Sequence, residues 1–268
     1  MEIQGIYNKN DDIKCHGKNI FEATSKYLDR FPLEYRACYD YNIRDIELYK
    51  VDIIVDDFGV ATYVPDTNVI IFEKSYTLGH ELFHVASEDR CHNTTAMANK
   101  LGVEDGFVEG ITEYFHMKAY DLSDPTTYYF HTFCVMMLED IPDIFRSYFI
   151  PTDNTFFTKI TDPKLVYSFL YALDVYHDNY SKYEDSILAG NRNKDYGALV
   201  EKSFMDVVHY LISIELSLYH DQVELDKYGD KFMDLLSSGL LAKTMSLLYP
   251  GYKKYAEKEV NIRIRKKV

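Results

Sequence analysis

The sequence contains few residues that interrupt regular secondary structure or cross-link the chain. Its 268 residues include 7 prolines, 12 glycines and 4 cysteines, and the cysteines, Cys15, Cys38, Cys91 and Cys134, form no CxxC pair. So little proline and glycine argues against long disordered linkers, and the cysteine spacing suggests neither a zinc ribbon nor a dense disulfide framework. We therefore predict a folded chain whose cysteines are free thiols.

Positive charge is also scarce. Lys and Arg number 29 against 43 Asp and Glu, which gives a formal net charge of -14. So acidic a chain is expected to bind neither nucleic acid nor an anionic membrane as its main partner. The sequence also lacks an apolar run of about 18 residues and a basic leader followed by an apolar segment. We expect a cytoplasmic protein, whose oligomeric state the sequence does not indicate.

Short runs of β-branched and aromatic residues predict strands in the first third of the chain. These runs are 51–55, 60–64 and Val69–Phe72, and turn-forming residues 65–68 separate the last two. This spacing predicts a small meander or hairpin.

Helical periodicity dominates the remainder. We expect one or two helices within 20–49, broken at Pro32, and further helices over 75–87 and 107–120. Another helix should begin at Asp162 and Pro163, and a further one covers 198–219. The pattern predicts an α+β fold with a mainly helical C-terminal half. The two regions would be 1–155 and 156–268, the second packed on the first, unless the chain forms a single domain.

The residues HELFH, from His80 to His84, form the HExxH pattern. Two histidines four residues apart lie on one face of a helix, so both imidazoles can bind one metal ion. Glu81 then lies beside the metal, where its carboxylate can accept a proton from water. The flanking residues are mostly apolar, which predicts a buried helix with one polar seam; the alternative is a surface helix without a metal.

A second predicted helix carries Glu109 and Glu113, four residues apart. The 24 residues between His84 and Glu109 leave room for a loop and a return to the metal. Catalytic zinc commonly has three protein ligands, and two histidines with one glutamate are an established set. The two glutamates could instead form a solvated helix face. Three other residues could replace Glu109 as third ligand: His92, His116 and, less readily, Glu104.

HELFH followed by VEGITEYF, residues 108–115, resembles the gluzincin clan of zinc metallopeptidases. The resemblance implies a zincin-like catalytic region in 1–155, with His80, His84 and Glu109 as zinc ligands and Glu81 as general base. It also implies that Glu113 holds a zinc ligand in position without binding the zinc itself. The implied substrate is a peptide or protein, and the implied cofactor is Zn²⁺.

The resemblance also implies how such an enzyme would work. Glu81 would take a proton from zinc-bound water during attack on the peptide carbonyl and pass it to the leaving amine. A Tyr or His usually helps the zinc to stabilise the oxyanion, and the spacing does not choose among Tyr171, Tyr176, His177 and His209. An edge strand at Val69–Phe72 would align the peptide by main-chain pairing.

Two other functional classes remain open. ExxH occurs at Glu81–His84 and again at Glu113–His116, which is the spacing of di-iron carboxylate bundles. Such bundles also need one glutamate from each of two other helices, and Glu22 and Glu109 are the candidates. A regulatory or non-catalytic module could also keep the metal-binding shape without turnover.

Overall fold

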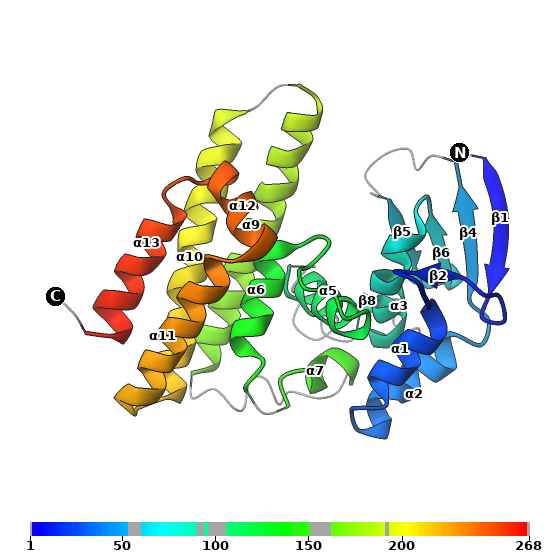
Figure 1. The fold of residues 1–268 in the computed structure, drawn as a ribbon, viewed down its shortest axis with the longest axis horizontal. Coiled ribbons are helices and arrows are strands. Elements are labelled where there is room, and N and C mark those ends of the chain that lie inside the picture. Colours follow the sequence, from blue (N-terminus) through cyan, green and yellow to red (C-terminus); the bar gives the residue numbers. More distant parts are fainter. Residues whose placement is uncertain are drawn as a thin grey trace. The chain divides into compact units, whose positions relative to one another are not determined.

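A computed structural model describes residues 2–52, 60–89, 94–95, 106–141, 143–150, 162–190 and 193–266 (Figure 1). Packing divides the chain into two compact units, each built from three segments. The first comprises Met1–Gly102, Ile111–Thr126 and Phe145–Asp153. The second comprises Val103–Gly110, Thr127–Ile144 and Asn154–Val268. The predicted boundary at 155 lies outside the described residues and stays a prediction.

The first unit contains a four-stranded mixed sheet in the order β1-β4-β6-β5. β4 pairs with β1 in antiparallel and with β6 in parallel orientation, and β5 and β6 form the predicted antiparallel hairpin. Leu48, Tyr63 and Ile70 are paired across three strands and are all buried, so one sheet face belongs to the core. The strands are β1 (Ile3–Asn8), β4 (Glu47–Val51), β5 (Ala61–Val64) and β6 (Val69–Phe72). Predicted strand residues 53–55 lie outside the described ranges.

Helices of the same unit complete its core. The predicted break at Pro32 is confirmed, because one helix ends before it and the next begins at Leu33. Phe115 is fully buried among the rings of other aromatic residues, which include Phe83 and Tyr148. The helices are α1 (Ile20–Leu28), α2 (Leu33–Asn42), α3 (Leu78–Ser87), α7 (Arg146–Phe149) and, from Ile111 onward, α5 (Gly106–Ala119), whose first residues belong to the second unit. β2 (Lys14–Cys15) and β3 (Lys18–Asn19) form a small hairpin, and β7 (Glu88–Asp89) pairs with β8 (Thr94–Thr95) in antiparallel orientation.

The second unit consists of helices in its described part. Side chains of Asp162, Asn193 and Asp221 accept backbone N–H bonds at three helix starts, and this confirms the predicted start at Asp162. Long helices α9 and α10 pack along each other. The helices are α6 (Tyr129–Leu138), α9 (Pro163–Leu188), α10 (Lys194–Leu218), α11 (Gln222–Leu236), α12 (Gly239–Leu248) and α13 (Tyr252–Glu259), which a π-helical turn, Val260–Ile264, follows.

The architecture confirms the predicted α+β class, with strands and helices first and a mainly helical C-terminal half. Within the described ranges, no helix combines the length and the apolar character needed to cross a lipid bilayer.

Candidate metal centre

Helix α3 holds both histidines of the HExxH pattern. Its residues Leu78, Leu82 and Val85 are fully buried, which anchors the helix in the first unit. His80 Nε2 and His84 Nε2 lie 3.1 Å apart. Two nitrogens bound to one tetrahedral zinc, each at 2.0–2.1 Å, are about 3.3 Å apart. The two imidazoles therefore converge with the spacing that a shared metal requires.

A glycine allows α3 to approach α5 closely. A Cβ atom at Gly79 would lie 2.5 Å from Tyr120 Cε2 and 2.7 Å from His116 Cδ2. Such distances are shorter than any normal carbon contact, so only glycine fits here without displacement of the two rings. Gly79 immediately precedes His80, and the close approach brings His80 within hydrogen-bonding distance of α5.

Helix α5 presents the acidic residues. The backbone N–H of Gly106, the first residue of α5, donates to Asp174 Oδ1 of α9 at 3.0 Å. Glu109, Glu113 and His116 follow at i, i+4 and i+7 and therefore share one face of α5.

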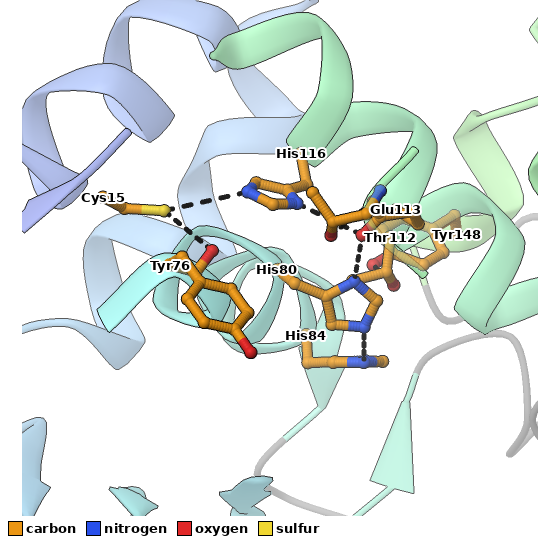
Figure 2. Close-up of polar contacts among 9 residues, drawn as sticks. Cys15, Tyr76, His80, His84, Thr112, Glu113, His116 and Tyr148 are labelled. Atoms are coloured by element: carbon orange, nitrogen blue, oxygen red, sulfur yellow. Dashed lines mark hydrogen bonds and ion pairs between the residues drawn. The ribbon is translucent and has the colours of Figure 1, made fainter. Parts of the chain in front are cut away.

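Glu113 is the centre of the hydrogen-bond network (Figure 2). Its Oε2 lies 2.8 Å from His80 Nδ1 and 3.1 Å from His116 Nδ1. Its Oε1 accepts the backbone N–H of Thr126 at 2.5 Å and the hydroxyl of Thr126 at 2.9 Å. Burial alone would raise the pKa of this carboxyl, but the bonds from His116 and His80 more than offset that effect and hold its pKa well below its usual range. Glu113 is therefore an ionised, acceptor-only group.

The ionised carboxylate determines where the histidine protons lie. An acceptor-only Oε2 requires His80 and His116 each to carry a proton on Nδ1. An imidazole whose single proton is on Nδ1 has a lone pair on Nε2. A carboxylate behind a histidine is the usual way in which proteins orient metal-binding imidazoles.

Ligand atoms of His80, His84 and Glu109 all lie within 4.8 Å of one another, so these residues could hold a metal ion. A second group with the same property comprises His80, Glu113 and His116. The two groups differ in the use of Glu113, whose oxygens already accept four hydrogen bonds. In the first group Glu113 does not bind the metal and is left to orient His80 through their hydrogen bond. For this reason the first group is the better set of metal ligands. The assignment of ligands stays a prediction.

Glu81 is buried on α3 beside His80. Within the described ranges it belongs to none of the groups that could hold a metal. Of the alternative third ligands, His116 bonds to Glu113 and lies outside the first group, while His92 and Glu104 lie outside the described residues.

The sheet order contradicts the prediction that Val69–Phe72 is an edge strand that aligns a peptide. Val69–Phe72 forms β6, which lies between β4 and β5 and is not an edge strand. Among the described strands, β5 is the one at that edge of the sheet, and it packs against α3. The sequence could not show this order, because the parallel pairing of β4 with β6 joins strands that are not consecutive.

Sequence reasoning missed a third group that could hold a metal: Cys15, His16 and His116. Cys15 is buried in the first small hairpin, and burial raises the pKa of its thiol to about 12. The dipeptide Cys15-His16 was the only local signal, since its partner His116 lies about 100 residues further along the chain.

It also missed the buried histidine His131, which interacts with the charge of Glu109. Burial and the neighbouring charge of His177 lower the pKa of His131 well below its usual value, although the charge of Glu109 acts in the opposite direction. Neither His131 Nε2 nor His177 Nδ1 has a hydrogen-bond partner within the described part of the chain. Tyr176, another predicted oxyanion candidate, is buried, and its hydroxyl lies 3.8 Å from Met245 Sδ.

Comparisons with known proteins add no relative. No protein-family model, no curated protein and no solved structure matches this chain.

Proposed function

We propose that the chain is a zinc-dependent metallopeptidase of the gluzincin kind, with His80, His84 and Glu109 as zinc ligands. The observation that carries this proposal is the 3.1 Å separation of His80 Nε2 and His84 Nε2, with Glu109 in the same potential metal group. Two imidazoles and one carboxylate form a borderline donor set that suits zinc and leaves a fourth position open.

The chain's own residues have distinct tasks in this proposal. Glu113 holds the proton of His80 on Nδ1 and so keeps the Nε2 lone pair available to the metal. A zinc ion held here supplies a Lewis acid that acidifies water and polarises a carbonyl group. Glu81 accepts the proton of the attacking water at its carboxylate and delivers that proton to the nitrogen of the leaving amine.

The substrate in this proposal is a peptide or protein. Of the strands that the structure describes, β5 lies at the edge of the sheet next to α3, and its outer edge can pair with an extended main chain. Such pairing recognises the backbone, so it suits cleavage within a chain better than removal of single terminal residues.

The proposed activity is tested with Glu81→Gln, assayed on a mixed peptide library and on denatured proteins. The variant keeps the size of Glu81 but lacks its proton acceptor, so we expect zinc to remain while hydrolysis falls by about 10²-fold or more. Full activity of the variant would exclude Glu81 as the base. No cleavage by the unmodified protein, loaded with one zinc in this site, would favour a non-catalytic metal module.

The ligand set is tested by plasma mass spectrometry of Glu109→Ala and His84→Ala. We expect both variants to lose the zinc of this site. Retention of that zinc by Glu109→Ala would place the third ligand elsewhere. Two irons per chain would instead support the di-iron alternative, which has weak structural support: Glu81 joins none of the potential metal groups among the described residues.

A further inference from the structure

We propose that Cys15, His16 and His116 form a second zinc site, separate from the one on α3. Their ligand atoms all lie within 4.8 Å of one another. The three residues, called the Cys15 cluster below, join the hairpin of β2 and β3 to helix α5. None of its ligands belongs to the group of His80, His84 and Glu109, so this site does not depend on the proposed peptidase activity.

The distance between the two buried ligands of the Cys15 cluster fits a shared metal. Cys15 Sγ and His116 Nε2 are 3.8 Å apart (Figure 2). For a tetrahedral zinc, with Zn–S near 2.3 Å and Zn–N near 2.05 Å, the expected S···N distance is about 3.6 Å. As a hydrogen bond the same contact would be long and weak, which leaves the Nε2 lone pair of a fully buried imidazole poorly used.

Glu113 prepares His116 as it prepares His80. Its Oε2 receives Nδ1–H of both rings, so the two Nε2 atoms are left as the metal-binding positions. One carboxylate thereby orients a ligand for each of two sites. Figure 2 shows the two rings bonded to Glu113, with Cys15 next to His116 and His84 next to His80.

The hairpin brings the third ligand to the Cys15 cluster and leaves it accessible. His16 and Gly17 connect β2 to β3, and both have positive φ, 48° and 78°, as a tight two-residue turn requires. His16 is exposed, and its ring centroid lies 5.4 Å from that of His116. A metal ion can therefore enter from the side of His16 although Cys15 and His116 are buried.

The donor set points to zinc, because thiolate and imidazole together are ligands that zinc prefers. In the metal-free protein the Cys15 thiol donates to the carbonyl oxygen of Tyr76 at 3.0 Å. When zinc binds, the thiol proton passes to the solvent and the resulting thiolate coordinates the metal. The bound ion would fix the hairpin to α5, to which Lys18 already ties it through a 3.0 Å bond to the carbonyl oxygen of Ala119.

The experiment is a titration of the full metal-free chain with Co²⁺ and, in parallel, with Zn²⁺. A thiolate ligand gives a sulfur-to-cobalt charge-transfer absorption in the near ultraviolet. We expect this band in the unmodified protein and in His84→Ala, and we expect Cys15→Ser and His16→Asn to lose it. Asn tolerates the left-handed turn conformation, so His16→Asn keeps the hairpin. Cys38→Ser is the matched control and should keep the band.

Zinc stoichiometry separates the two sites. We expect two ions per unmodified chain, and one in Cys15→Ser, in His16→Asn and in His84→Ala. No sulfur-to-cobalt band in the unmodified protein, or a band that survives Cys15→Ser in a folded variant, would overturn the second site. A band that depends on Cys15, with only one zinc bound and no effect of His84→Ala, would support it while refuting the site on α3.

Discussion

Replacement of Glu113 by glutamine tests the proposed control of histidine tautomers. The new side chain would be nearly isosteric but would have one acceptor oxygen instead of two. If that oxygen faces Thr126, the amide NH₂ faces Nδ1 of His80 and Nδ1 of His116, and both imidazole protons must move to Nε2. The nitrogen that should bind the metal is then protonated. If the amide is reversed, its NH₂ faces the N–H of Thr126.

The magnitude follows from the same contacts. Loss of an outer carboxylate typically weakens metal binding about 10- to 100-fold. Each factor of ten corresponds to about 1.4 kcal/mol, so the cost is about 1.4–2.8 kcal/mol, which agrees with about 1–3 kcal/mol for one buried polar group left unpaired. We expect zinc affinity at the α3 site to fall by this amount.

The assay is competition for zinc against a chromophoric chelator, with the tautomers read by NMR from the imidazole nitrogens. Glu22→Gln, at an exposed position of α1, is the matched control and should bind zinc as the unmodified protein does. Folded Glu113→Gln protein with zinc affinity within about twofold of the unmodified protein would refute the argument, since loss of a carboxylate that orients a ligand typically costs about 10- to 100-fold. Weaker zinc binding in the Glu22→Gln variant would instead revive the di-iron alternative.

Three further substitutions test the packing and the electrostatics by urea unfolding. Gly79→Ala should lower the free energy of unfolding by about 1–2 kcal/mol, because the new Cβ overlaps two rings. Gly197→Ala is the control and should leave that free energy unchanged or raise it, because its Cβ lies 3.4 Å or more from its neighbours. Phe115→Ala should lower the free energy of unfolding by about 3–5 kcal/mol, as other truncations of large buried side chains do, whereas Tyr171→Ala, at an exposed position, should lower it by less than about 0.5 kcal/mol. Similar losses in the two variants would show that the aromatic core is not tightly packed. Burial raises the pKa of Glu215 to about 8, above its value in the unfolded chain. The contribution of Glu215 to the free energy of unfolding is therefore fully present below about pH 4.5 and is lost, by up to ~5 kcal/mol, as the pH rises to about 8. Glu215→Gln should remove this decline, and an unchanged pH profile would exclude Glu215 as its source.

Local sequence spacing predicted the parts of the site that depend on one helix. The i, i+4 spacing of His80 and His84 determines their common face wherever α3 lies, and the same holds for Glu109 and Glu113 on α5. The hairpin of β5 and β6 was likewise predictable from its turn residues and strand propensities.

The sequence could not show contacts that depend on tertiary packing. The cap of α5 by Asp174 joins residues 68 positions apart, and the contact of Cys15 with His116 joins residues 101 positions apart. No local pattern marks either pair. The position of β6 inside the sheet was missed for the same reason, because strand order depends on pairing between strands distant in sequence.

The sequence distances within the Glu113 network bear on the order in which it assembles during folding. Glu113 is 33 residues from His80, whereas Cys15 is 101 residues from His116. Closure of the longer loop costs about 1 kcal/mol more chain entropy, since this cost grows with the logarithm of loop length. Contacts between α3 and α5 should therefore form before the N-terminal hairpin docks. In refolding with cobalt, the imidazole-dependent spectrum should precede the thiolate band.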